Sequence, residues 1–395
     1  MKIAKKILLV FVVLCFVLFI RTTVRSANGD LTPLEELGKH LFFDSNLSTP
    51  PGQSCAACHS AETGFTGADS DINMSTAVYP GAVHTRFGNR KPPTSAYGGE
   101  SPVLYYDEAE ALWIGGMFWD GRATGWTLGD PLAEQAQGPF LNKLEQNNPN
   151  PQHVILKIRK SEYAGLFEQV WGPGSLNWTK DEAGTYVRIA RSIAAYERSS
   201  EVNPFNSKYD LFLKGQAELT PDEAEGLELF NGKAMCSACH ISEPGPNGEP
   251  PLFTDFTYDN LGIPKNPANP FYHMPAHWNP DRVNWVDPGL GGFLKNAGFG
   301  SEVYEPELGK HKVPTLRNVD LRPYASFTKV FGHNGYFKSL EEIVHFYNTR
   351  DAEPWPAPEV PGTINRDELG DLGLTAKEEA AIVAFMKTLS DGYVR

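Results

Sequence analysis

Cysteine is scarce in this chain: the 395 residues include five cysteines, and four of them fall in two short pairs. This scarcity argues against a disulfide-dense scaffold. A zinc ribbon would bring its two Cys-x-x-Cys pairs within roughly 20 residues of each other, whereas Cys58 and Cys236 lie in different halves of the chain. The four paired cysteines therefore need an explanation other than disulfides or zinc.

Basic charge and strand patterns are also scarce. Lysine and arginine number 35 against 48 acidic residues, which gives a net charge of −13. Because no basic stripe is present, this balance argues against nucleic-acid binding. A partner with a basic face would suit the chain, although a merely soluble acidic protein has the same composition. Sparse strand patterns, 31 prolines and 37 glycines predict a mainly α protein with long loops.

The N-terminus, MKIAKKILLVFVVLCFVLFIR, places three lysines before an apolar run from Ile7 to Ile20. These are the charged and apolar regions of an export signal. At ~1.5 Å per residue the run covers about 21 Å as a helix, less than the ~30 Å core of a bilayer. Cleavage near Ala27 and an uncleaved anchor both remain open, and Cys15 lies inside the run as a bystander. Residues 1–27 therefore predict a signal or anchor, and a chain located in the periplasm.

Each pair of cysteines is followed at once by a histidine, in Cys-Ala-Ala-Cys-His and Cys-Ser-Ala-Cys-His. A redox Cys-x-x-Cys motif does not need that histidine. Covalent haem attachment does, because two thioethers hold the porphyrin edge and the adjacent imidazole ligates the iron. Two such motifs on an exported chain predict a c-type cytochrome with two haems. The residues concerned are Cys55, Cys58, His59, Cys236, Cys239 and His240.

The two halves of the chain repeat each other loosely. A Gly-x-x-Leu-Phe segment precedes each haem motif, at residues 38–42 and 226–230. Each half also closes on an amphipathic helical pattern, in which Tyr196 corresponds to Phe385. We therefore expect two cytochrome c-like domains that each bind one covalently attached haem. These are residues 28–205, with the first haem, and residues 206–395, with the second.

Beyond the first haem motif the chain resembles the bacterial di-haem cytochrome c peroxidase and MauG superfamily over essentially everything after the N-terminal segment. The segments that carry the resemblance are LGKHLFFDSNLSTPPGQSCAACH, NRKPPT, FWDGRA, EQAQGPFLNKLEQ, PTLRNVDLRPY and HNGYFKSLEEIVHFY. FWDGRATGW and HNGYFKSLEEIVHFYNTRD are most similar to the MauG-like branch linked to methanobactin gene clusters (MbnH). The resemblance implies that the first haem is the site that reacts with hydrogen peroxide.

The resemblance also implies roles for single residues. Glu145 matches the family's catalytic glutamate, which would move a proton between the two peroxide oxygens. Gln135 matches a glutamine beside the bound oxygen, and Trp119 matches the tryptophan between the haems, which would relay electrons. An ordinary surface role for Glu145 and Gln135, and a core role for Trp119, are the alternatives. Asp120 and Arg122 are expected to pin the turn after Trp119, or to hold a haem propionate.

The resemblance also suggests which residues could be the sixth ligand of each haem iron. His84 lies seven residues upstream of Lys91, close to where peroxidases carry a removable ligand of the first iron, and a solvated loop histidine is equally expected. For the second iron the family offers methionine or tyrosine after Leu-Arg-Asn-Val, a segment without methionine here. Tyr324 is the first candidate, followed by Met274 and His333.

Calcium is the remaining cofactor that the resemblance implies, held between the haems by oxygen ligands. The asparagine of the family's Arg-Asn-x-Pro-Thr segment is replaced by Lys91. This replacement weakens the expectation without removing it, because Asn89 could supply the ligand in its place. Calcium therefore stays among the expected cofactors.

The leading hypothesis is a periplasmic di-haem oxidoreductase that reacts with hydrogen peroxide and, like MauG, uses the oxidising equivalents on a side chain of a partner protein. A tryptophan would be the target in the MbnH-like case. One alternative is a cytochrome c peroxidase that reduces hydrogen peroxide to water with electrons from a small cytochrome c or cupredoxin. Another is a di-haem electron carrier without catalysis.

Overall fold

The computed structural model describes residues 30–394. The predicted export segment, residues 1–27, lies outside the described residues. Within the described part, helices and long loops dominate and the strands form two short two-stranded sheets, so the expected mainly α class is confirmed. No helix between residues 30 and 394 is long and apolar enough to cross a membrane.

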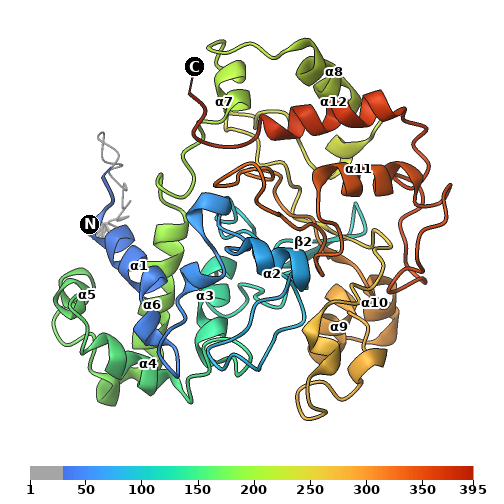
Figure 1. Cartoon of the computed structure of the whole chain (residues 1–395). Helices are drawn as coiled ribbons and strands as arrows, with labels where there is room; N and C mark the ends of the chain where they lie inside the picture. The colour runs from blue at the N-terminus through green and yellow to red at the C-terminus, as the bar shows by residue number, and fades with distance from the viewer. Residues whose placement is uncertain (1–29, 395) are drawn as a thin grey trace, which may run out of the picture.

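Most helices of the N-terminal half gather on one side of the molecule, while α2 (Ser70–Ser75) lies nearer the C-terminal half (Figure 1). Several begin at side-chain caps, as at α1, where Thr32 accepts from the N–H of Glu35 and the Glu35 carboxylate accepts from the N–H of Thr32. The helices are α1 (Pro33–Phe43), α2 (Ser70–Ser75), α3 (Pro131–Leu141), α4 (Pro151–Ile158), α5 (Ala164–Trp171) and α6 (Trp178–Glu197).

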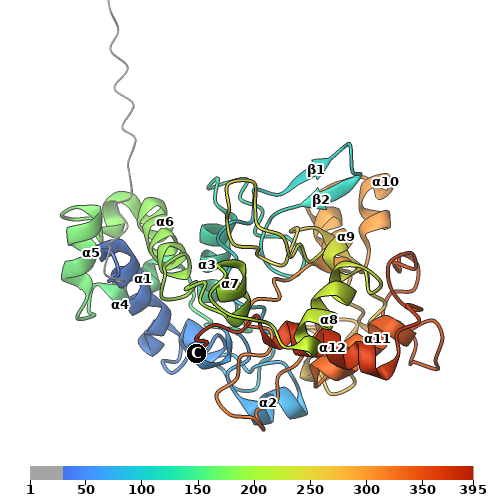
Figure 2. The same cartoon turned by 90° about the horizontal axis from the view of Figure 1, so that it is seen from above.

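The C-terminal half contains the remaining helices and one of the two sheets (Figure 1). Its helices are α7 (Lys208–Leu213), α8 (Pro221–Asn231), α9 (Gly289–Asn296), α10 (Ser301–Tyr304), α11 (Leu340–Thr349) and α12 (Ala376–Lys387). The strands β3 (Tyr258–Asp259) and β4 (His311–Lys312) pair antiparallel. In the N-terminal half, β1 (Tyr105–Asp107) and β2 (Leu112–Ile114) form a hairpin that lies beside α10 (Figure 2).

The sequence repeat appears as two helix crossings of the same kind. In the first half α1 crosses α6 at Gly38, where an added Cβ would lie 1.9 Å from the carbonyl oxygen of Ser192. In the second half α8 crosses α12 at Gly226, where the distance to the carbonyl oxygen of Ala381 is also 1.9 Å. Only glycine allows these helices to approach so closely. Each crossing therefore sets one opening helix against one closing helix, as the repeat predicts.

Aromatic rings fill both crossings in the same way. The ring centroids of Phe42 and Tyr196 lie 5.5 Å apart in the first half, and those of Phe230 and Phe385 lie 5.1 Å apart in the second. Each pair belongs to its own hydrophobic cluster. The buried residues of the first cluster come from the chain between Leu37 and Val202, and those of the second come from the chain between Tyr209 and Leu389.

Two turns cross between the halves. The short bridges Met117–Ala123 and Phe331–Phe337 close the turns that carry Trp119 and His333. The N–H of Lys312 donates to the carbonyl of Trp119 at 2.9 Å, and the N–H of Lys91 donates to the carbonyl of His333 at 3.0 Å. Each turn therefore accepts a main-chain hydrogen bond from the other half, and Trp119 and His333 lie where the two halves meet.

Candidate functional site

The first Cys-x-x-Cys-His segment folds as a 3₁₀ turn over Cys55–Ala57. The N–H groups of Cys58 and His59 both donate to the carbonyl of Cys55, at 3.1 and 3.0 Å, so two thiols and an imidazole leave one tight turn. His59 Nδ1 lies 3.0 Å from the carbonyl oxygen of Phe65. A carbonyl accepts only from a protonated Nδ1, and this tautomer leaves Nε2 free to ligate iron.

The second motif repeats this arrangement. Its 3₁₀ turn covers Cys236–Ala238, and His240 Nδ1 lies 2.9 Å from the carbonyl oxygen of Phe253. Burial lowers the pKa of both His59 and His240, because the charged imidazolium loses its water. The neutral imidazole that results is the form that binds a metal. None of the four cysteines in the two turns is in a disulfide, so all four thiols are available for thioether bonds.

A cavity opens beside the second motif. Its lining includes the thiols of Cys236 and Cys239, the imidazole of His240, and apolar side chains such as Phe230 and Ile382. Three lysines also line it: Lys91, Lys312 and Lys329. A c-type haem requires two thiols, a neutral imidazole, apolar walls for its faces and cations for its propionates. The residues present fit such a haem.

Glu145 lies close to the first motif. Burial, and then the charge of Glu145, raise the pKa of the Cys58 thiol. The pKa of Glu145 is itself raised because burial disfavours the carboxylate, although Arg122 opposes this shift. The N–H of Ala82 donates to the carbonyl of Glu145 at 2.8 Å and fixes its main chain. Gln135 is partly buried on α3, the helix that leads into the turn of Glu145.

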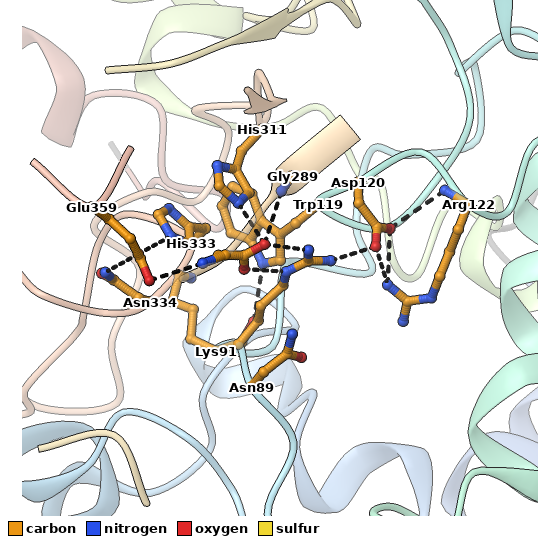
Figure 3. Close-up of polar contacts among 12 residues, drawn as sticks. Asn89, Lys91, Trp119, Asp120, Arg122, Gly289, His311, His333, Asn334 and Glu359 are labelled. Carbon is orange, nitrogen blue, oxygen red and sulfur yellow. Dashed lines mark hydrogen bonds and ion pairs between the residues drawn. The ribbon is translucent and has the colours of Figure 1, made fainter. Parts of the chain in front are cut away.

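Trp119 lies buried between the halves, 7% exposed, and lines the cavity of the second motif. Its indole N–H donates to the carbonyl of Lys91 at 3.0 Å (Figure 3). The Lys91 ammonium lies 5.7 Å from the centre of the same indole. The structure thus brings the predicted relay tryptophan to the junction of the two halves.

Buried ion pairs surround Trp119 (Figure 3). Arg90 pairs with Asp120 at 2.7 Å and with Asp287 at 2.6 Å. Asp120 also pairs with the guanidinium of Arg122 at 2.8 Å and accepts from its main-chain N–H at 3.4 Å. Asp120 and Arg122 therefore pin the turn after Trp119, which is one of the two roles predicted for them.

Two buried histidines extend this cluster, although no motif in the sequence pairs them. The rings of His311 and His333 stack with centroids 3.6 Å apart and planes within 7°. His311 Nε2 lies 3.3 Å from Asp287, and His333 Nε2 lies 3.2 Å from Glu359. Asp287, His311 and His333 are close enough to hold a metal ion. The two parallel rings point their in-plane lone pairs along separate planes, and Arg90 already pairs with Asp287. The cluster is therefore a stacked pair flanked by carboxylates, in which His311 Nε2 makes no hydrogen bond to a described residue.

Two of the ligands predicted for the second iron lie away from the cavity of the second motif. Tyr324 is 54% exposed, and Met274 is buried after the 3₁₀ turn Pro270–His273. Among the described residues that line the cavity are His333 but neither Tyr324 nor Met274. The reason is the loop after Leu-Arg-Asn-Val, which carries Tyr324 outward to solvent. His84 is also exposed on its loop, as expected of a solvated histidine.

Lysine occupies the position where the family has a calcium ligand. Lys91 is 9% exposed, and its Nζ lies 3.3 Å from the carbonyl of Pro92. The ammonium of Lys329 is buried near enough to Lys91 for the two charges to interact. Asn89 accepts a hydrogen bond from an asparagine through its main-chain carbonyl, at 2.8 Å. Burial lowers the pKa of Lys91 to about 8 and that of Lys329 well below the usual lysine value. A lysine Nζ offers no oxygen ligand, so these residues do not fit the calcium ion that the resemblance implies.

Glu197, the last residue of α6, is a buried acid that the sequence analysis missed. It is 3% exposed and its Oε2 has no hydrogen-bond partner. Burial raises the pKa of Glu197 to about 8. The pKa of the Cys55 thiol is raised first by its own burial and next by the charge of Glu197. A signal was present, because Ile189, Ile193 and Glu197 follow each other at intervals of four on the buried face of the helix.

Comparisons with known proteins agree with this geometry. A family model described as di-haem cytochrome c peroxidase matches residues 32–218. The chain is 33% identical over 372 residues to the methylamine utilization protein MauG of Paracoccus denitrificans, an alignment that covers 91% of this chain and 88% of that protein. It is 30% identical to the diheme peroxidase BthA from Burkholderia thailandensis, with a TM-score of 0.76, over 92% of this chain and 87% of that structure.

A MauG-like protein associated with microbial copper homeostasis shares the fold. Its structure aligns with a TM-score of 0.62, over 92% of this chain and 91% of that one, at 23% identity. At this identity the likeness concerns the fold alone, so the finer placement in the MbnH-like branch stays a prediction.

Proposed function

Because the chain belongs to the family of di-haem cytochrome c peroxidases and MauG proteins, we propose that it reacts with hydrogen peroxide at a haem on Cys55, Cys58 and His59. In this proposal the enzyme then uses the oxidising equivalents on a side chain of a partner protein. Membership makes the chain a di-haem oxidoreductase. The observation that carries the proposal is the partly buried carboxyl of Glu145, which lies close enough to the first of two Cys-x-x-Cys-His turns for its charge to raise the pKa of Cys58.

The proposed roles at the first haem follow from position and protonation. The haem iron supplies the centre at which peroxide binds and its O–O bond breaks. Glu145 takes the proton from one peroxide oxygen and delivers it to the other, so that water can leave. Burial suits this task, because a carboxyl with a raised pKa holds a proton more readily than an exposed one. Gln135 donates a hydrogen bond from its amide to the bound oxygen.

The second haem is proposed to be attached through Cys236 and Cys239, with His240 as its proximal ligand. Of the ligands suggested for its distal side, His333 is the one that lines the cavity. Trp119 is proposed to carry electrons between the two haem sites, since it is buried at the junction of the halves with its N–H hydrogen-bonded.

The exposed position of His84 favours the partner-oxidising version over the peroxidase that must first be activated. A removable ligand of the first iron would have to point into the structure, and His84 is solvated on a surface loop. This observation supports a first iron that meets peroxide without prior reduction of the second. Oxidation of a partner tryptophan is the finer form of the proposal, and it rests on the resemblance to the MbnH-like branch.

The decisive experiment is to mix the fully oxidised di-haem protein with one equivalent of hydrogen peroxide in the absence of a donor. Visible, near-infrared and EPR spectra then follow both ferric haems. Immediate loss of both ferric signals is the expected result. A reaction that starts only after one haem is reduced would instead support a cytochrome c peroxidase with a small cytochrome c or cupredoxin as donor. No reaction in either state would leave a di-haem electron carrier.

A periplasmic location is part of the proposal. It rests on the charged and apolar regions of residues 1–27, which either form a cleaved signal or anchor the chain to the inner membrane. Haem attachment at the Cys-x-x-Cys-His turns would then take place after export.

A further inference from the structure

The β1–β2 hairpin forms a projecting surface beside α10 (Figure 2). Tyr105 and Tyr106 are 44% and 40% exposed, and Trp126, in the segment after β2, is 48% exposed. The indole N–H of Trp126 donates to the carbonyl of Leu104, the residue before β1, at 2.7 Å. We call Tyr105, Tyr106 and Trp126 the hairpin aromatics. Large aromatic side chains that are exposed together mark interaction surfaces on soluble proteins.

Ring contacts continue from the hairpin aromatics into the interior. Tyr106 and its cross-strand partner Trp113 have ring centroids 5.6 Å apart. Trp113 lies 5.6 Å from Phe299, and Trp126 lies 6.3 Å from the same ring. Because Trp113 is only 6% exposed, the surface rings and the buried rings form one packed group.

Tyr258 links this group to Trp119. It belongs to the same buried cluster as Trp113, and its hydroxyl donates to the carbonyl of Gly115 at 2.5 Å. It also pairs with Lys312 across β3 and β4, and the N–H of Lys312 donates to the carbonyl of Trp119 at 2.9 Å. Oxidisable rings at Trp119, Tyr258 and Trp113 therefore mark a route from the junction of the halves to the hairpin aromatics, joined first through the main chain of Lys312 and then through one buried cluster.

Acidic side chains surround the hairpin aromatics. Asp107, Glu108 and Glu110 stand at the tip of the hairpin, while Glu302 and Glu305 lie in and directly after α10. All but Asp107 are exposed. Together with the net charge of −13, this rim attracts and orients a protein with a basic face.

We propose that the hairpin aromatics and their acidic rim are the docking surface for a basic redox protein that exchanges electrons with the enzyme through Trp113, Tyr258 and Trp119. This inference rests on the proposed function. Reduction of one hydrogen peroxide to two waters takes up two electrons and two protons. The docked partner therefore gives up two electrons in all, either as two molecules of a one-electron donor or as one protein oxidised twice.

The test uses a basic ferrocytochrome c as the donor and measures its steady-state oxidation by hydrogen peroxide at several ionic strengths. The rim variant combines Asp107→Asn, Glu108→Gln and Glu110→Gln, which removes three negative charges from the hairpin tip. The matched control removes three exposed charges elsewhere, with Glu162→Gln, Glu218→Gln and Asp367→Asn. A third variant, Tyr106→Ser with Trp126→Ser, removes aromatic contact area without changing the charge.

We expect the rim variant to raise KM for the cytochrome roughly tenfold at low ionic strength and to flatten its salt dependence. The aromatic variant should raise KM at every ionic strength, and the control should behave as the wild type. Unchanged KM and salt dependence in the rim variant would overturn the docking surface. Wild-type protein whose haems do not react with peroxide would instead overturn the proposed function, so the two failures are distinguishable.

Discussion

The carbonyl oxygen of Lys91 accepts the indole N–H of Trp119 at 3.0 Å, and the ammonium of the same lysine lies 5.7 Å from the centre of that indole (Figure 3). The indole is therefore fixed in orientation by the residue that also places a positive charge near it. A nearby cation makes removal of an electron from the ring less favourable. A radical on Trp119 is therefore disfavoured, which agrees with the proposal that this indole passes electrons on and does not keep a radical.

Trp119→Phe tests this relay. Phenylalanine keeps an aromatic ring at the junction but lacks the N–H and the easily oxidised indole. We expect the second haem to lose its ferric signal roughly tenfold more slowly after mixing with peroxide, while the first haem still reacts. Rapid-mixing absorption and EPR distinguish the two haems, and Trp171→Phe on α5 is the control. Equal rates for both haems in Trp119→Phe would refute the relay.

Glu145→Gln tests the proton transfer at the first haem. Glutamine has the same size but cannot exchange a proton, so the rate of the peroxide reaction should fall by a factor of about 10² to 10⁴. Glu145→Asp, which retains an acid, should recover part of the rate, and its pH profile should move with the new carboxyl. The rate constant is measured by stopped-flow at several pH values. An undiminished rate in Glu145→Gln would remove Glu145 from the mechanism.

Much of the fold was predictable because its signals are local. The Cys-x-x-Cys-His turns are defined by five consecutive residues, and the glycines at 38 and 226 mark the two helix crossings directly. Residues 243–312 are rich in proline, glycine and asparagine, a composition that predicts an extended loop, yet they contain α9 and α10. α9 carries three glycines, which lower its intrinsic helix propensity, and packing in the cluster with Trp113 and Leu290 stabilises it instead.

The parts of the site that could not be predicted depend on contacts between distant segments. Asp287 and Glu359 stand in loops without a motif, and only the tertiary fold brings them to His311 and His333. Tyr324 looked like a ligand because of its place after Leu-Arg-Asn-Val, but the longer loop there turns its side chain to solvent. Sequence position alone does not fix where a side chain in a lengthened loop points.

Gly226→Ala is expected to destabilise the protein strongly. The added methyl would lie 1.9 Å from the carbonyl oxygen of Ala381 and 2.9 Å from the Cβ of Phe385, so α8 and α12 would have to separate. A loss of about 3 kcal/mol in the free energy of unfolding is expected. Gly165→Ala on α5 is the control, since no atom lies within 4 Å of its added Cβ, and it should gain about 0.5–1 kcal/mol. Denaturant unfolding gives both values, and equal stabilities would contradict the close crossing.

Calcium should be absent from the purified di-haem protein. The Lys91 side chain stands at the position of the expected ligand and offers no oxygen. The nearby Lys329 Nζ already donates to three main-chain carbonyls, those of Thr63, Asn318 and Leu321. We therefore expect elemental analysis to find no bound calcium, and treatment with a chelator to leave the EPR spectra of both haems unchanged. One calcium ion per chain, or spectra that change on chelation and recover with added calcium, would contradict this prediction.

Glu197→Gln should stabilise the protein at neutral pH and leave it unchanged in acid. Burial raises the pKa of Glu197 to about 8, whereas an unfolded glutamate titrates near pH ~4.3. At any pH between these two pKa values, Glu197 keeps its proton in the folded chain and loses it in the unfolded chain. The free energy of unfolding therefore falls as pH rises through this range. Glutamine is neutral throughout and removes this loss, which amounts to about 3 kcal/mol at pH 7.

The measurement is denaturant unfolding of wild type and Glu197→Gln at a series of pH values between about 4 and 8. The difference in stability should be near zero at the acid end and grow steadily toward neutral pH, because burial outweighs the nearby Arg198 charge and the Oε2 of Glu197 has no hydrogen-bond partner. Glu162→Gln, at an exposed position, should show no such trend. A stability difference that does not depend on pH would mean that Glu197 is ionised in the folded protein and has found a partner there.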